Sequence, residues 1–165
     1  MSINYNNNTI RVVDPGFKKN NCTSIPLYSL SSDSINARSP YNVYDYEYSS
    51  MDRIWISRAV TFIKCANPVN SSLYVDTALC MNSTTGGATS LSQPRTYSYV
   101  VMGPTVAWDL EEGCSIGWTA MASLNEKDRN ASYSHIHNAL VYGFELQYIT
   151  GIHVDPYRYT RLSRK

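Results

Sequence analysis

Hydrophobic and polar residues alternate with a period of two in several stretches of this chain. The alternation places Val60 and Phe62 on one face of residues 59–64, and it continues through Tyr97–Met102. These stretches are rich in β-branched and aromatic residues, as expected of half-buried strands. The pattern recurs at residues 9–14, at Ile116, Trp118, Ala120 and Ala122, and at Tyr142, Phe144, Leu146 and Tyr148. Five such stretches predict a mainly β fold of the α+β type with antiparallel strands.

Helices are the minor element of the pattern. Ser134 is a suitable N-terminal cap for a short helix that carries Ile136 and Leu140. A second short helix is predicted over residues 107–112. Residues 20–39 contain many Ser, Thr, Asn and Pro residues, which is typical of a loop. We therefore expect one or two short helices beside the strands.

Length and charge limit the classes of function. A chain of 165 residues is long enough to bury about two thirds of its unfolded surface, so disulfides are not required merely for folding. Its net charge of +1 provides no field strong enough to hold a nucleic-acid backbone. No stretch approaches the roughly 18 to 20 apolar residues of a membrane span. We expect neither a nucleic-acid partner nor a membrane span in this chain.

Five sequons of the type Asn-x-Ser/Thr indicate passage through the secretory pathway. The alternative is that they are accidental, since the chain is rich in Asn, Ser and Thr. The candidate glycosylation sites are Asn7, Asn21, Asn70, Asn82 and Asn130.

Four cysteines, Cys22, Cys65, Cys80 and Cys114, support an oxidising compartment. They show neither a CxxC motif nor the spacing of zinc ligands. Three complete pairings are open to them. A bond between Cys65 and Cys80 would close a loop of 15 residues and contribute about 3 kcal/mol by chain entropy. Free buried thiols are the alternative, most of all for Cys22.

Residues 1–8 are polar and contain neither the basic head nor the apolar core of a signal peptide. The sequons and cysteines nevertheless favour secretion. We therefore expect the chain to be a fragment of a longer secreted protein.

An ordered set of motifs runs through most of the chain. It comprises INYNNNTIRVVD (3–14), NCTSIP (21–26), FIKCANPVNSSLYVDTALC (62–80), YSYV (97–100), DL (109–110) before Cys114, IHN (136–138) and YGFEL (142–146). This set resembles the extracellular region of plant receptor-like kinases of the rust-resistance-kinase type. These are relatives of the wall-associated kinases, which carry a galacturonan-binding, cysteine-rich module.

The resemblance implies an organisation and a ligand. Residues 1–39 correspond to the end of the galacturonan-binding module, 40–58 to a Tyr-rich linker, 59–149 to a β-rich lobe of the ectodomain, and 150–165 to a basic tail. It implies a location at the cell wall or outer face of the plasma membrane, and pectin or oligogalacturonide as ligand. The upstream part of the module is missing from this chain, and no kinase motif is present.

Aromatic side chains suit a sugar surface because their faces stack on sugar rings, and arginines suit an acidic sugar. The segment around residue 50 offers both types. An alternative is that these tyrosines are half-buried strand residues, and Asp45 and Glu47 would repel a polyuronate. The candidate carbohydrate contacts are Tyr44, Tyr46, Tyr48, Arg53, Trp55 and Arg58.

No catalytic constellation is visible in the sequence. His135 and His137 are two apart, so on a helix they point in different directions and make a poor metal pair. Glu111 and Glu112 are adjacent and cannot flank a glycosidic bond. We predict a noncatalytic protein without a cofactor or a metal, which binds a polysaccharide. The alternatives are a module that binds a peptide or a co-receptor, and a truncated product without independent activity.

Overall fold

The computed structural model describes residues 2–4, 9–30, 41–42, 44–46, 53–81, 96–103, 105–125, 128 and 130–148. The strands are Ser2–Asn4 (β1), Thr9–Val12 (β2), Tyr41–Asn42 (β3), Tyr44–Tyr46 (β4), Arg53–Trp55 (β5), Arg58–Cys65 (β6), Val75–Asp76 (β7), Tyr97–Met102 (β8), Cys114–Ala122 (β9) and Phe144–Tyr148 (β10). The helices are Ala78–Met81 (α1), Tyr133–Tyr142 (α2) and the 3-10 helix Ala107–Asp109 (η3). All paired strands among these residues are antiparallel. The predicted mainly β, α+β fold with short helices is confirmed.

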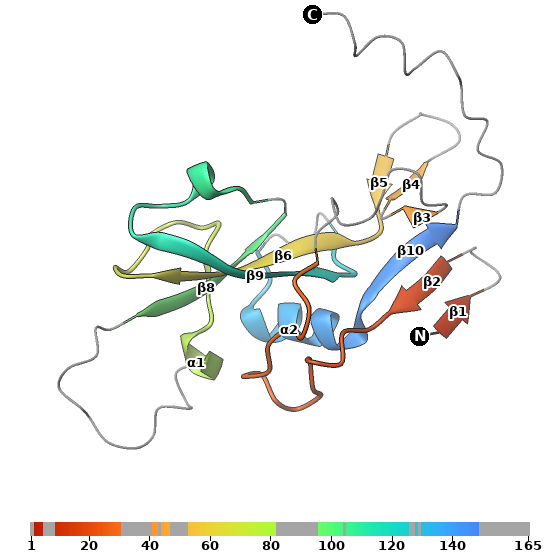
Figure 1. The fold of residues 1–165 in the computed structure, drawn as a ribbon, viewed down its shortest axis with the longest axis horizontal. Coiled ribbons are helices and arrows are strands. Elements are labelled where there is room, and N and C mark those ends of the chain that lie inside the picture. Colours follow the sequence, from red (N-terminus) through yellow and green to blue (C-terminus); the bar gives the residue numbers. More distant parts are fainter. Residues whose placement is uncertain are drawn as a thin grey trace, which may run out of the picture.

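Strands β6, β8 and β9 are the longest of the described strands, and with the short β7 they form a four-stranded sheet in the order β7-β8-β6-β9, which we call the long sheet (Figure 1). Strand β6 is central, and its residues from Ala59 to Ile63 are all buried. Alternate residues of β6 therefore supply cores on two faces. Val60 and Phe62 face one core, whereas Ile63 and Cys65 face the other.

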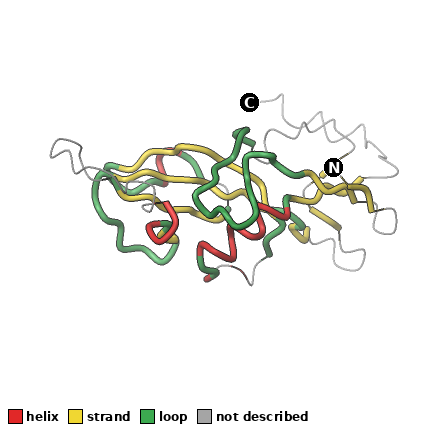
Figure 2. Tube along the Cα trace, turned by 90° about the horizontal axis from the view of Figure 1, so that it is seen from below, coloured by secondary structure: helices red, strands yellow, loops and turns green. Residues whose placement is uncertain are grey.

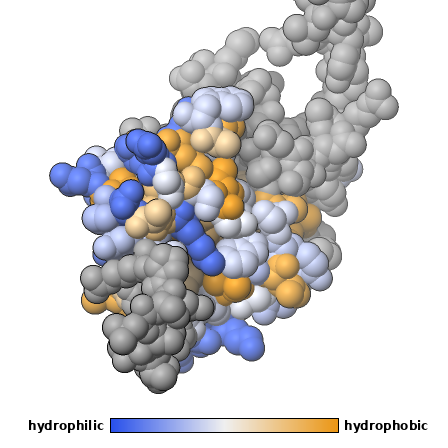
Figure 3. All heavy atoms as spheres, turned by 60° about the vertical axis from the view of Figure 1, so that its left-hand side comes forward, coloured by the Kyte–Doolittle hydropathy of each residue, from blue (hydrophilic) through white to orange (hydrophobic). Residues whose placement is uncertain are grey.

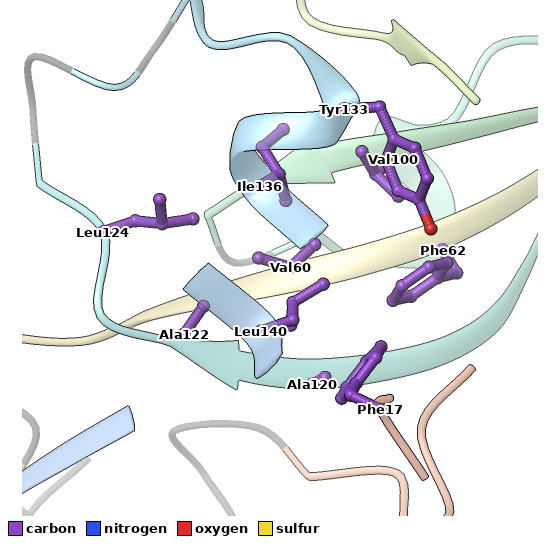
Figure 4. Packing of buried hydrophobic residues seen from close by; sticks show 10 residues of the cluster. All are labelled: Phe17, Val60, Phe62, Val100, Ala120, Ala122, Leu124, Tyr133, Ile136 and Leu140. Carbon is purple, nitrogen blue, oxygen red and sulfur yellow. The ribbon is translucent and has the colours of Figure 1, made fainter. Parts of the chain in front are cut away.

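Helix α2 lies on one face of this sheet (Figure 2). Ile136 and Leu140 on α2 pack against Val60 from the sheet, and all three are almost fully buried. Figure 4 shows this cluster together with Phe17, which comes from the N-terminal segment. The helix begins after Ser132, whose side chain accepts a hydrogen bond from the backbone of His135. The predicted cap Ser134 was thus wrong by two residues.

A second sheet has the order β1-β2-β10-β3 and joins the two ends of the described chain. Gly143 connects α2 to β10 with φ of 98°, a conformation that favours glycine. A side chain there would also collide with the carbonyl group of Val12. Phe144 then packs with Ala59 and Met121, which links the two sheets. Residues 9–30 thus share one packed unit with the later segment, while the expected family origin of residues 1–39 stays a prediction.

Strand β9 contains an irregularity that its sequence pattern does not reveal. Trp118 pairs with Phe62, but Ile116 pairs with Ile63, so Gly117 is the extra residue of a β-bulge. Ile116 and Trp118 therefore lie on opposite faces of the sheet, which corrects the prediction that they share one. The predicted second helix is shorter than expected, since η3 ends at Asp109.

Two disulfides join the four cysteines, and neither is the predicted Cys65–Cys80 bond. Cys65 pairs with Cys114 because the two residues are directly opposite in the β6–β9 ladder, with Cα atoms 4.0 Å apart. Cys80 on α1 pairs with Cys22, with Cα atoms 5.4 Å apart. Cys22, one of the four disulfide candidates, is therefore bonded, and the alternative of a free thiol there is not observed. Spacing along the chain failed here because strand pairing decided which cysteines meet.

Candidate functional site

Residues 14–30, which we call the strap, cross the α2 side of the long sheet between β2 and the edge strand β9. The Asp14 carboxylate closes the strap by accepting backbone hydrogen bonds from Gly16, Leu27 and Tyr28 at 2.7, 3.0 and 3.1 Å. Gly16 is required in this turn, since a Cβ there would lie 2.5 Å from the Ile25 carbonyl oxygen. The far end pairs with β9 through Leu30. The strap thus holds a fixed path over the sheet.

A buried serine–histidine pair ties the strap to α2. Ser24 Oγ lies 2.9 Å from His137 Nε2, and the two residues are 8% and 3% exposed. The serine hydroxyl donates to the Asn21 carbonyl at 2.6 Å and accepts from the Lys18 N–H at 3.1 Å. With its proton committed to Asn21, Ser24 accepts rather than donates toward the imidazole. The two side chains therefore form a buried structural hydrogen bond. A catalytic serine would instead donate its proton to the histidine, and Ser24 does not.

Burial also perturbs the titrating groups around this pair. Desolvation lowers the pKa of His137 below its usual value, while a hydrogen bond with the Asn21 backbone opposes the shift. Burial raises the pKa of Tyr133 to about 12. The Tyr133 hydroxyl donates to the Cys22 carbonyl at 3.2 Å. Both groups are therefore uncharged at neutral pH and anchor the strap through neutral hydrogen bonds.

Among the described residues, a candidate binding surface lies on the same face of the sheet, beyond the part that α2 covers. It is a hollow of about 310 Å³, which we call the Lys64–Trp118 hollow. Lys64 and Trp118 come from β6 and β9, and the Lys64 Nζ lies 5.5 Å from the centroid of the Trp118 ring. Ile25 on the strap and Met81 on α1 complete the sides.

The chemistry of the Lys64–Trp118 hollow is aromatic and cationic. Among the described residues that line it, Lys64 is the one charged side chain. Thr96 and Ser98 supply hydroxyl groups, whereas the buried Thr77 hydroxyl donates to the Ser98 backbone carbonyl at 2.8 Å. Such a surface suits a flat ligand with one apolar face, several hydroxyls and a negative charge.

The Cys22–Cys80 disulfide joins two sides of this hollow. Cys22 lies three residues before Ile25 on the strap, and Cys80 is adjacent to Met81. Both cysteines pack against the main core. The Cys65–Cys114 disulfide belongs to the cluster on the opposite face of the sheet. The first disulfide therefore fixes the sides of the hollow, whereas the second does not.

The sequence-predicted sugar contacts lie elsewhere. Strands β4 and β5 pair so that Tyr44 is opposite Trp55 and Tyr46 is opposite Arg53. The backbone thus brings these four positions together in a hairpin, within the segment expected to be a linker. Arg58 begins β6 and borders another groove, while Tyr48 lies outside the described residues. Their role in sugar contact stays a prediction.

Sequence reasoning placed Lys64 and Trp118 on strands but did not select them as site residues. Lys64 lies within the motif at residues 62–80 but was not singled out there, and Trp118 lies in no motif. The register of β6 with β9 had to be known before Trp118 could be assigned to the face of Lys64. Of the candidate glycosylation sites, Asn21, Asn70 and Asn130 are exposed. Asn7 and Asn82 lie outside the described residues.

Comparison with known proteins gives no assignment. No protein-family model matches the chain, and no curated protein or solved structure is significantly similar to it. Within the described ranges, no helix has the length and apolar character needed to cross a bilayer. The same residues contain no group of three or more His, Cys, Asp and Glu side chains arranged to hold a metal ion.

Proposed function

We propose that this chain is a noncatalytic polysaccharide-binding fragment of an extracellular receptor region, with an acidic, pectin-type polymer as ligand. The observation that carries the proposal is the Lys64 ammonium beside the Trp118 ring in a hollow that also presents hydroxyl groups. The two disulfides are compatible with an extracellular location. The motif resemblance to plant wall-associated receptor kinases gives the ligand class.

In the proposed complex, one uronate ring lies against the indole of Trp118. The apolar face of the sugar ring packs on the aromatic face, and the carboxylate meets the Lys64 ammonium. Lysine reaches the carboxylate through its flexible four-carbon stem. Ser98, which is opposite Lys64 in the ladder, hydrogen-bonds a sugar hydroxyl. A neutral glucan would form the stacking contact alone and bind more weakly.

The test is retention of the secreted, disulfide-bonded chain on polygalacturonate, compared with a neutral glucan, at low and high salt. We expect retention on polygalacturonate that falls as salt screens the exposed lysine. Lys64→Met keeps most of the stem and removes the charge, so it should weaken binding about tenfold. Lys19→Met is the matched control, since Lys19 is an exposed lysine on the strap outside the hollow. Equal retention on both polymers contradicts the proposal.

A protein or peptide partner is the second candidate, and Trp108 is the observation that favours it. This η3 residue is 84% exposed, and Val106 beside it is 37% exposed. Figure 3 shows hydrophobic residues exposed between hydrophilic ones on the face turned toward the viewer. Cross-linking at the cell surface after pectinase treatment separates the candidates. Recovery of a protein partner that Trp108→Ala abolishes would favour the second one.

A further inference from the structure

A second hollow lies at the opposite end of the long sheet from Lys64 and Trp118. It measures about 460 Å³, and we call it the Asn130 groove. Its lining includes Arg58 at the start of β6, Met102 and Gly103 at the end of β8, and Leu73, Asn125 and Asn130 from the adjoining segments. Leu73 is 70% exposed. The groove thus combines exposed apolar surface with amide and guanidinium donors.

Gly103 helps to keep this groove open. Its φ of 108° favours glycine, and a Cβ built there would meet no atom within 4 Å. The backbone of Gly103 is fixed by a hydrogen bond of 2.8 Å to the Ala59 carbonyl. The space is therefore a built feature of the end of the sheet, held by the β6–β8 pairing.

Asn130 is both a wall of this groove and the first residue of the sequon Asn130-Ala131-Ser132. Its side chain is exposed, as an acceptor of a glycan must be. Ser132 caps α2, so the backbone that follows Asn130 is fixed at the start of a helix. A sugar joined to Asn130 therefore begins at the wall of the hollow and at a defined place.

We propose that an N-linked glycan on Asn130 occupies this groove with its first N-acetylglucosamine residues. The apolar face of the sugar packs on Leu73 and Met102, and its hydroxyl and acetamido groups accept hydrogen bonds from Asn125 and Arg58. Covalent attachment makes the contact intramolecular, so weak contacts suffice to hold the sugar in place. The inference depends on the secretory passage assumed in the proposed function and is independent of any pectin ligand.

The experiment uses the full chain secreted from a eukaryotic host, trimmed with an endoglycosidase that leaves one N-acetylglucosamine per site. Mass spectrometry gives the occupancy of each sequon. NMR then measures NOEs between sugar protons and the methyl groups of Leu73 and Met102, and hydrogen exchange reports protection of the groove backbone. We expect an occupied Asn130, NOEs to both methyl groups, and exchange that increases around residues 71–74 and 102–103 in Asn130→Gln.

A double-mutant cycle with Asn130→Gln and Leu73→Ala separates glycan contact from loss of packing. The two changes should be non-additive in the unfolding equilibrium constant by about three- to tenfold, because each removes the same contact. Asn21→Gln is the control, since Asn21 is an exposed sequon residue on the strap and outside the groove, and it should be additive with Leu73→Ala. An occupied Asn130 without NOEs, or strict additivity, overturns the inference. An empty Asn130 beside an occupied Asn21 or Asn70 also overturns it, whereas a chain without any glycan refutes the secretory premise of the proposed function as well.

Discussion

Removal of the two disulfides should have equal effects on stability and unequal effects on binding. Cys22 and Cys80 are 58 residues apart, and Cys65 and Cys114 are 49 apart. Loop entropy depends on the logarithm of loop length, so each bond stabilises the fold by about 4 kcal/mol. That is a large part of the roughly 5–15 kcal/mol by which domains are stable. Both double Cys→Ala variants should therefore unfold at much lower denaturant concentration.

Ligand affinity should distinguish the two variants. The Cys22–Cys80 bond joins the strap to α1 at the sides of the Lys64–Trp118 hollow, so its loss releases Ile25 and Met81. The assay is titration with oligogalacturonate, under conditions in which near-UV circular dichroism shows that both variants are folded. We expect affinity to fall about tenfold or more in Cys22→Ala/Cys80→Ala and to change little in Cys65→Ala/Cys114→Ala. Equal affinity losses in the two variants, or stability losses well below 4 kcal/mol in both, would refute this reasoning.

Three further predictions concern the strap. Because burial lowers the pKa of His137, the unfolded chain binds the proton more readily. Stability should be complete above about pH 6.5, the ordinary His pKa, and decrease as the pH falls toward the folded-state pKa. Urea unfolding across pH measures this, and His137→Gln should remove the dependence. Gly16→Ala places a Cβ against the Leu27 backbone and should destabilise the fold by about 2–3 kcal/mol, as measured by thermal unfolding. Gly117→Ala is the control and should have a smaller effect, since its Cβ would lie 3.4 Å from the nearest atom. Asp14→Ala removes the acceptor of three backbone hydrogen bonds and should lower the free energy of unfolding by about 1–3 kcal/mol, measured by chemical denaturation. Asp14→Asn keeps one acceptor oxygen and should lose less.

Local patterning predicted the strands because burial on one face imposes a period of two on the residues themselves. Val60 and Phe62 lie on one face as predicted, and α2 carries Ile136 and Leu140 into the core. The alternation failed at Gly117, where a bulge shifts the register. A bulge depends on the partner strand, so the alternation within β9 does not reveal it, although an isolated glycine such as Gly117 is a residue at which bulges often occur.

Spacing along the chain could not predict contacts between residues that are far apart in the sequence. The Cys22–Cys80 bond and the contact of Ser24 with His137 depend on the path of the strap over the sheet. The predicted sugar site was chosen because tyrosines and arginines are close together in the sequence there. The Lys64–Trp118 hollow instead combines residues from two strands, the strap and α1, which are adjacent only in the folded chain.

The most direct test of the central claim observes the Trp118 indole itself. The chain has three tryptophans, and their indole N–H signals can be assigned by substitution and followed by NMR during titration with oligogalacturonate. We predict that the Trp118 signal shifts and saturates, and that Lys64→Met weakens this response about tenfold. A Trp118 signal that stays unchanged while polygalacturonate retains the chain would contradict the account.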